Sequence, residues 1–167
     1  HPLLDGLKIK FSKEEFCNQN DLKAHQPILA LLPGSRYQEI ENLLPTMLET
    51  ARAIQKEKPD LQIAVSKAPS INDDLFLQLI ENETVITDPT YDLMKHSTAA
   101  MVASGTATLE TALFETPFVI VYKVSPLSYF IGKKLVKIDS IGLVNVVYGD
   151  KIVPEFIQHD VEVEKIK

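Results

Sequence analysis

Two short, uninterrupted apolar runs, each followed by small polar residues and then by a helical pattern, restrict this chain to an α/β fold. Ile28–Leu32 precedes Pro33-Gly34-Ser35-Arg36 and a long periodic stretch, Tyr37–Lys58. Ala99–Ala103 precedes Ser104-Gly105-Thr106 and a second helical stretch that ends before Pro117. Apolar runs without alternation are typical of parallel strands that are covered on both faces. We therefore expect a Rossmann-like, doubly wound parallel sheet.

The rest of the chain continues this alternation of strand and helix with short connections, within the length of one domain. Ser12 and Glu15 have the spacing of a capping box, which predicts a helix that starts at Lys13. Pro45 falls inside the long periodic stretch and is expected to kink that helix or to split off its first turns. Further strands are expected at Leu61–Val65, Thr84–Thr87 and Phe118–Tyr122, and further helices at Lys13–Asn20, Ile71–Leu79, Tyr91–His96 and from Val161 onward.

The two turns have the composition of an anion site. A helix N-terminus leaves backbone N–H groups unpaired and carries a partial positive charge, and Gly105 lets the backbone approach a ligand. Because ligands of open α/β sheets bind beyond the carboxyl ends of the strands, both turns are expected to face one crevice. Arg36 would supply a planar donor fork for a diphosphate, and Glu110, one helical turn further in, would accept hydrogen bonds from ribose hydroxyls. The residues therefore predict a nucleotide site.

Each of these features also has a simpler explanation. Ser104 and Thr106 are residue types that often merely cap a helix. Arg36 is of a type that usually lies in solvent in a first helical turn. A cation at a helix start is nevertheless unfavourable unless an anion accompanies it, and the strand–turn–helix pattern occurs twice. Together these points favour the nucleotide site.

Charge and composition narrow the function classes. The formal net charge of −6 gives no broad basic surface for nucleic acid. The single cysteine, Cys17, excludes an internal disulfide, favours a cytosolic setting and is expected to be inert or half-exposed. The sequence contains neither a D-x-D motif nor a histidine cluster, so no metal site is expected. His25 and His96 have no hydroxyl or thiol partner at a catalytic spacing and are expected at the surface or at a helix cap.

Residues 117–138 form a local basic stretch with four lysines and no acid. The lysines, Lys123, Lys133, Lys134 and Lys137, alternate with apolar side chains. Two interpretations stay open: an interfacial helix that approaches anionic lipid, or a packed amphipathic helix with a solvated lysine face. No apolar run approaches the roughly 20 residues that cross a bilayer, so any membrane contact would be peripheral.

Three stretches carry a resemblance to a known family: LALLPGSRYQEI, MVASGTATLETALFETPFVIVYK and IGLVNVVYGDKIVPEFIQ. They resemble the carboxyl-terminal half of lipid-A-disaccharide synthase, a GT-B glycosyltransferase with two Rossmann-like domains. The resemblance implies transfer of 2,3-diacylglucosamine from UDP to a 2,3-diacylglucosamine 1-phosphate acceptor, with release of UDP. It also implies an interdomain linker at residues 1–11 and a donor-nucleotide-binding domain at residues 12–167. On this basis the chain is expected to be a fragment, inactive without its acceptor domain, from a cytoplasmic protein that contacts the inner membrane peripherally.

The two turns and the resemblance together give the site residues. Arg36 would stabilise the leaving diphosphate, and Glu110 would hold the ribose. The resemblance implies no metal or other cofactor, and the UDP-sugar is itself a substrate. The general base is not identifiable and would belong to the absent half. The residues expected around the phosphates are Gly34, Ser35, Arg36, Ser104, Gly105, Thr106 and Thr108, and those that the resemblance places near the donor are Asn145, Glu155 and Gln158.

Several residues and the function itself keep alternatives. Asn145 alone would read as a turn residue, and Glu155 as a first-turn helix acid after Pro154. Tyr122 and Lys123 either touch the nucleotide or only finish a strand. The alternative functions are a UDP-sugar epimerase of GT-B build and a UDP-binding module without catalysis.

Overall fold

A computed structural model describes residues 7–123 and 140–167 of the chain. Six parallel strands form one sheet in the order β3-β2-β1-β4-β5-β6, which is the Rossmann order. The expected α/β, doubly wound fold is therefore confirmed. The strands are β1 Ile28–Leu32, β2 Gln62–Ser66, β3 Thr84–Ile86, β4 Ala99–Ala103, β5 Phe118–Tyr122 and β6 Glu155–Ile157.

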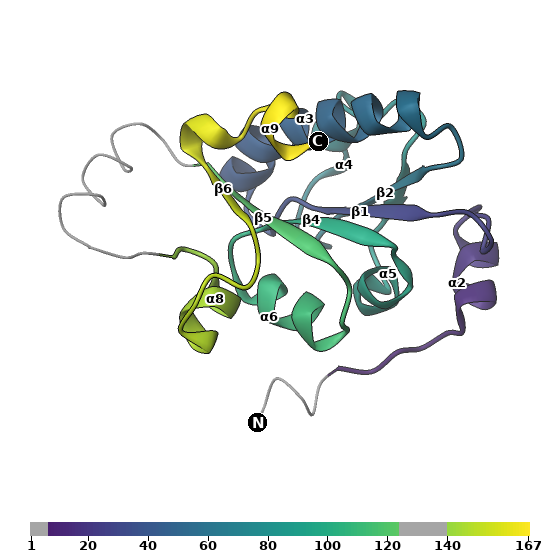
Figure 1. The fold of residues 1–167 in the computed structure, drawn as a ribbon. Helices are drawn as coiled ribbons and strands as arrows, with labels where there is room; N and C mark the ends of the chain where they lie inside the picture. Colours follow the sequence, from purple (N-terminus) through teal and green to yellow (C-terminus); the bar gives the residue numbers. More distant parts are fainter. Residues whose placement is uncertain (1–6, 124–139) are drawn as a thin grey trace.

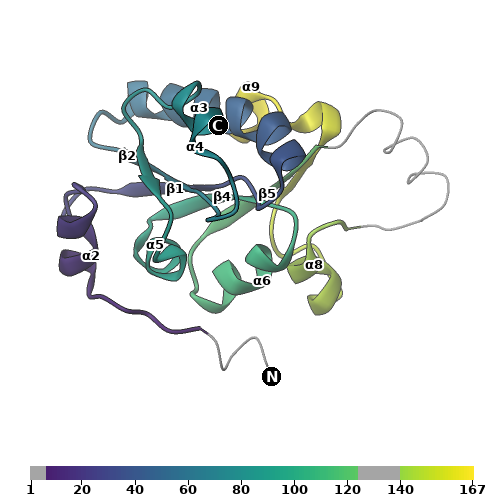
Figure 2. The same ribbon diagram turned by 180° about the vertical axis from the view of Figure 1, so that it is seen from behind.

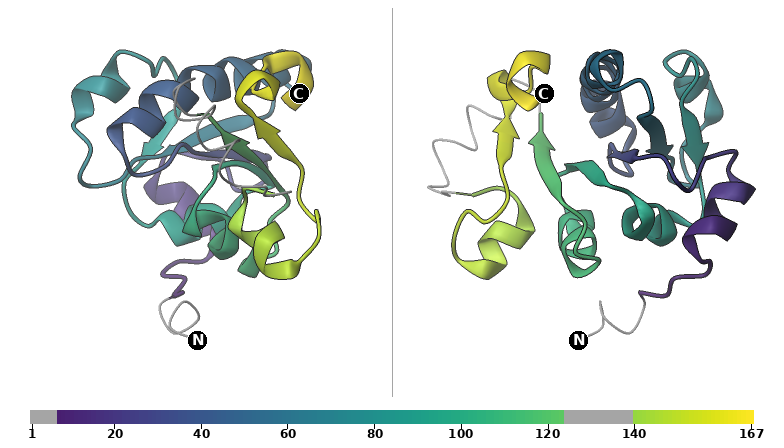
Figure 3. Two further views of the ribbon diagram at one scale, coloured as in Figure 1. Left: turned by 90° about the vertical axis from the view of Figure 1, so that its left-hand side faces the viewer. Right: turned by 45° about the vertical axis from the view of Figure 1, so that its right-hand side comes forward.

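Helices cover both faces of this sheet (Figures 1 and 2). Viewed across the strands, the sheet lies between an upper and a lower helical layer (Figure 3). One layer holds α3 Tyr37–Glu57, α4 Asp73–Leu77 and α9 Val163–Ile166. The other holds α2 Lys13–Gln19, α5 Thr90–His96, α6 Thr106–Leu113 and α8 Leu143–Tyr148, and a 3-10 turn, η1, spans Gln158–Asp160.

The central strand β1 contributes side chains to two apolar cores. Leu29 and Leu31 pack in the core under α3, while Ile28, Ala30 and Leu32 pack in the core under α2 and α5. Because successive strand residues point to opposite faces, a strand that is buried on both sides needs apolar residues at every position. This requirement explains the uninterrupted apolar run.

Two expectations about helices can be checked directly. The capping box of α2 is confirmed, because Ser12 Oγ accepts a hydrogen bond from the Glu15 N–H and Glu15 accepts one from the Ser12 N–H. The expected splitting of the long helix at Pro45 is wrong, since α3 runs unbroken through that residue. Leu44 and Met47 beside Pro45 are fully buried, and this packing holds the segment helical despite the missing N–H.

The carboxyl-terminal elements correct two of the simpler explanations. Glu155 lies on strand β6, where it pairs with β5, and not in the first turn of a helix. Asn145 lies inside α8 and is not a turn residue.

Cys17, on α2, is not half-exposed but fully buried. Burial raises the pKa of its thiol, in keeping with an inert residue.

Helix α5 holds the segment that precedes α2. Asp92 on α5 is fully buried, and its carboxylate accepts the backbone N–H groups of Lys10 at 3.1 Å and Phe11 at 2.7 Å. His96, one turn later, lies 2.9 Å from the Phe11 carbonyl oxygen through Nε2. His96 therefore serves the packing of this segment. The part of the expected linker that precedes residue 7 lies outside the described residues.

The ion pair between Arg52 and Glu83 allows a prediction about folding stability. Glu83, with 5% of its side chain exposed, accepts a hydrogen bond from Arg52 Nε at 2.6 Å. Burial raises the pKa of Glu83, but hydrogen bonds from Arg52 and from backbone N–H groups outweigh burial, so the folded pKa is lowered. A lowered folded pKa means that the carboxylate stabilises the fold above the unfolded pKa of about 4.3 and loses this effect as pH falls through the folded value.

We therefore expect Glu83→Gln to lower the free energy of unfolding at pH 7 by about 1–3 kcal/mol. In acid, below the folded pKa of Glu83, the variant and the parent chain should have nearly the same free energy of unfolding. Urea unfolding at pH 7 and in acid measures both values. Glu81→Gln is the matched control, because Glu81 pairs with the same Arg52 at 3.0 Å but is 68% exposed, and it should cost less than about 1 kcal/mol. If Glu83→Gln lowered the free energy of unfolding equally at pH 7 and in acid, the stabilisation would not come from the ionised carboxylate.

Candidate functional site

The sheet changes direction between its two central strands. Strands β1 and β4 are hydrogen-bonded neighbours, and from them the chain winds outward to β2 on one side and β5 on the other. In open parallel sheets, such a reversal leaves a crevice beyond the carboxyl ends of the strands. The turn after β1 leads into α3 and the turn after β4 leads into α6, on opposite faces of the sheet. Both helices therefore begin at this crevice.

A cavity of about 440 Å³ lies between the two turns. Arg36 from the first turn and Thr106 from the second both line it, as the sequence predicted for two turns that face one crevice. Glu110, from one helical turn further along α6, also lines this cavity. The predicted site residues on its wall are Gly34, Ser35, Arg36, Ser104, Gly105, Thr106 and Glu110.

The start of α6 is open toward this cavity. Ser104 does not cap the helix, since its Oγ donates to the Ile141 carbonyl at 3.0 Å, and the N-cap residue is Gly105, with no side-chain cap. The explanation of Ser104 and Thr106 as mere caps is therefore wrong. The backbone of Gly105 is extended, and a Cβ built there meets nothing within 4 Å. The space in front of the helix N-terminus is thus available to a ligand.

Arg36 and Glu39 form the other side of the opening. Arg36 is the N-cap of α3, its side chain is 81% exposed, and its Nη1 lies 3.0 Å from Glu39 Oε1. The Glu39 carboxylate also packs on Gly34, whose φ of +105° and lack of a side chain make room for it. The anion that accompanies the Arg36 cation at this helix start is therefore Glu39.

The predicted ribose residue Glu110 is half-buried and accepts a hydrogen bond from Tyr91 Oη at 3.3 Å. Burial and the charge of Glu110 both raise the pKa of the Tyr91 hydroxyl, so it stays a donor at neutral pH. Tyr91 lies in the first turn of α5, beside Thr90, which lines the cavity.

Sequence reasoning missed the contribution of β2 and α5 to this wall. Ser66 and Lys67, at the end of β2, line the cavity, as does Thr90. Lys67 Nζ donates to Asp73 Oδ1 at 2.7 Å and to the Ile71 carbonyl at 3.2 Å. The available signal in the sequence was their position, since Ser66 and Lys67 lie at the end of β2 and Thr90 follows β3, and the carboxyl ends of parallel strands meet at the same edge of the sheet.

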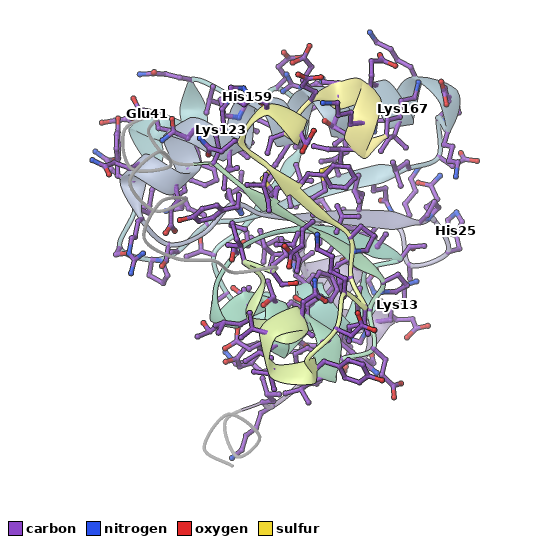
Figure 4. The ribbon with its side chains drawn as sticks, turned by 60° about the vertical axis from the view of Figure 1, so that its left-hand side comes forward. Lys13, His25, Glu41, Lys123, His159 and Lys167 are labelled. Carbon is purple, nitrogen blue, oxygen red and sulfur yellow. The ribbon has the colours of Figure 1, made fainter. Side chains whose placement is uncertain are left out.

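A second cavity of about 860 Å³ adjoins the first, and Arg36, Glu39, Ala103 and Ser104 line both. Its other walls come from the first turns of α3 and from the end of β5, where Tyr122 and Lys123 lie. Figure 4 shows Glu41 and Lys123 together at this end of the molecule, while His25 lies at the opposite edge. The wall between the cavities thus contains Arg36 and the end of β4.

Four predicted site residues lie behind the walls and line neither cavity: Thr108, Asn145, Glu155 and Gln158. Thr108 is fully buried and donates its hydroxyl to the Gly105 carbonyl at 2.7 Å, so it supports the turn, and its contact with a phosphate stays a prediction. Gln158 is buried just after β6.

Asn145, which is buried, and Glu155, which is half-buried, form a hydrogen-bonded cluster. Asn145, 1% exposed, donates to the Val153 carbonyl and to Glu155 Oε1, both at 2.8 Å, and accepts the N–H groups of Ile152 and Val153. Glu155 accepts the N–H groups of Ile141 and Gly142 at 3.0 Å. These bonds fix the segment that begins α8 beside both cavities. The pair shapes the site, and direct contact with a donor stays a prediction.

The described residues contain no group of three or more histidine, cysteine, aspartate and glutamate side chains placed to hold a metal ion. Among the same residues, no helix has the length and apolar character to span a membrane. Of the basic stretch at residues 117–138, the part from residue 124 onward lies outside the described residues, and with it Lys133, Lys134 and Lys137.

Comparison with solved structures agrees with the fold. The ADP-heptose lipopolysaccharide heptosyltransferase II of E. coli superposes with a TM-score of 0.64 over 95% of this chain and 50% of that protein, at 12% identity. A putative UDP-N-acetylglucosamine 2-epimerase from Listeria monocytogenes gives a TM-score of 0.51 over 88% of this chain and 40% of that protein, at 13% identity. At these identities the likeness concerns the fold alone.

Comparison with sequences is more specific. Lipid-A-disaccharide synthase of Persephonella marina is 41% identical over 99% of this chain and 46% of that protein, and that of Geobacter sulfurreducens is 39% identical over 99% and 44%. The chain thus spans less than half the length of these curated relatives. The family model described as lipid-A-disaccharide synthetase matches residues 1–167. With its whole length covered by that match, the chain belongs to the lipid-A-disaccharide synthetase family.

Proposed function

We propose that this chain is the donor-nucleotide domain of a lipid-A-disaccharide synthase. The whole protein would transfer 2,3-diacylglucosamine from UDP to 2,3-diacylglucosamine 1-phosphate and release UDP. The observation that carries the proposal is the shared cavity, where the turns after β1 and β4 bring Arg36, the open N-terminus of α6 and Glu110 to one wall.

The order of these groups along the two cavities supports one direction for the donor. The ribose binds Glu110, and the diphosphate lies at the wall shared by the two cavities, between Arg36 and the N–H groups that follow Gly105. The sugar on the far phosphate then enters the second cavity, whose wall carries the polar side chains of Gln38, Asn42 and Lys123. This arrangement requires the donor to span both cavities.

The chemistry follows from the charge at the shared wall. As the bond to the sugar breaks, negative charge builds on the departing diphosphate, and preorganised donors stabilise it. Arg36 and the backbone N–H groups of α6 supply these donors without a metal. Glu39 pairs with Arg36, and a diphosphate would compete with that carboxylate for the guanidinium.

The acceptor hydroxyl must also lose its proton, and we assign this task to no residue of the described part of the chain. The general base would come from the remainder of the protein, so this chain alone would bind UDP without turnover. We also propose that the protein is cytoplasmic. It would contact the inner membrane peripherally through the Lys123–Lys137 region.

Gly105 offers a test in which binding and folding respond differently. We expect Gly105→Ala to weaken UDP binding at least about tenfold, because its methyl group would occupy the space where the phosphate approaches, while stability stays unchanged. Gly149→Ala is the reverse control. Gly149 has a φ of +87°, so this variant should lose about 1 kcal/mol of stability and keep its UDP affinity.

Calorimetry with UDP, UMP, ADP and a UDP-glucosamine derivative, together with thermal unfolding, measures both effects. Negligible heats for all four ligands with the parent chain would refute the site. Conversion of the sugar without an acceptor would instead favour the epimerase, and UDP binding by a whole protein that transfers nothing would favour the binding module.

Glu110→Ala should weaken UDP binding by about 1–3 kcal/mol, since it removes charged hydrogen bonds to the ribose. The control is Glu49→Ala, which removes an exposed glutamate of α3 and should leave the affinity unchanged. Calorimetry with UDP again provides the measurement. An affinity equal to that of the parent chain would exclude Glu110 from the ribose role.

A further inference from the structure

Glu110 projects from a short helix toward an open cavity, and a glutamate in such a position can adopt several rotamers. The hydrogen bond from Tyr91 Oη to Glu110 Oε1 joins α5 to α6 across 19 positions of sequence. A carboxylate has about four acceptor sites on its two oxygens, so one donor leaves the other oxygen free for ribose hydroxyls. The bond therefore orients the carboxylate and leaves it able to accept further hydrogen bonds.

Tyr91 is itself held in place from two sides. Its ring packs against Phe114, with ring centroids 5.8 Å apart and planes tilted by 50°, and Phe114 follows Glu110 by one turn. Its neighbour Asp92 is fully buried and binds the backbone of Lys10 and Phe11. The first turn of α5 is thus anchored in the fold, which makes Tyr91 a fixed support for a side chain that a ligand is to meet.

We propose that Tyr91 is a positioning residue for nucleotide recognition, which orients the Glu110 carboxylate toward the ribose hydroxyls. This inference rests on the proposed function, because it requires a ribose at Glu110. Tyr91 acts through Glu110 and does not touch the nucleotide. Its contribution should therefore appear only with ligands that carry ribose hydroxyls.

The test compares UDP with 2′,3′-dideoxy-UDP, which lacks both hydroxyls, on the parent chain and on Tyr91→Phe. The phenylalanine keeps the ring against Phe114 and removes only the hydroxyl. We expect Tyr91→Phe to weaken UDP binding about three- to tenfold and to change the affinity for the dideoxy ligand less than about twofold. Tyr148→Phe, on an exposed residue of α8, is the matched control and should change neither affinity.

A double-variant cycle separates this inference from the function on which it rests. In a Glu110→Ala background, adding Tyr91→Phe should have no further effect on UDP affinity. Equal weakening of both ligands by Tyr91→Phe would indicate a general structural role and overturn the inference, as would an unchanged UDP affinity. If Glu110→Ala abolishes the preference for UDP while Tyr91→Phe leaves it intact, only the inference fails. If Glu110→Ala leaves the preference intact, the ribose role of the proposed function fails with it.

Discussion

The parallel pairing of β1 with β4 is the constraint on which the rest of this structure depends. Leu29 to Leu32 pair in register with Ala99 to Val102, although some 70 residues separate them. This pairing brings the ends of the two strands together, and with them the starts of α3 and α6 from opposite faces of the sheet. Two helix N-termini then present their positive ends to one crevice, which neither helix would achieve alone.

Three charged side chains around this crevice have polar partners within the chain. Arg36 is paired with Glu39, Lys67 with Asp73, and Glu110 with the hydroxyl of Tyr91. For Arg36 and Glu110, the partner orients a group that would bind the nucleotide. The Arg36 side chain is more exposed than that of Lys67. Its guanidinium can therefore leave Glu39 for another anion at little cost in desolvation.

Buried polar side chains behind the walls support the crevice. The Asn145 side chain accepts a hydrogen bond from the Ile152 N–H, and the Glu155 carboxylate accepts one from the Ile141 N–H. The Thr108 hydroxyl donates to the Gly105 carbonyl. Unpaired polar groups at such depth would be costly, and here they are satisfied by loop backbone. Residues that the family resemblance places near the donor can therefore matter to binding through the shape of the loops that they hold.

Local patterns of apolar period and turn chemistry were enough to predict the strand–turn–helix alternation, the two small-residue turns at Gly34–Arg36 and Ser104–Thr106, and the family. Which of the predicted site residues face the crevice follows from the way the chain folds. Thr108 and Asn145 are buried, Lys67 and Thr90 join the wall, and Tyr91 meets Glu110. These outcomes depend on sheet order and register, which relate residues far apart in the chain and leave no trace in local spacing.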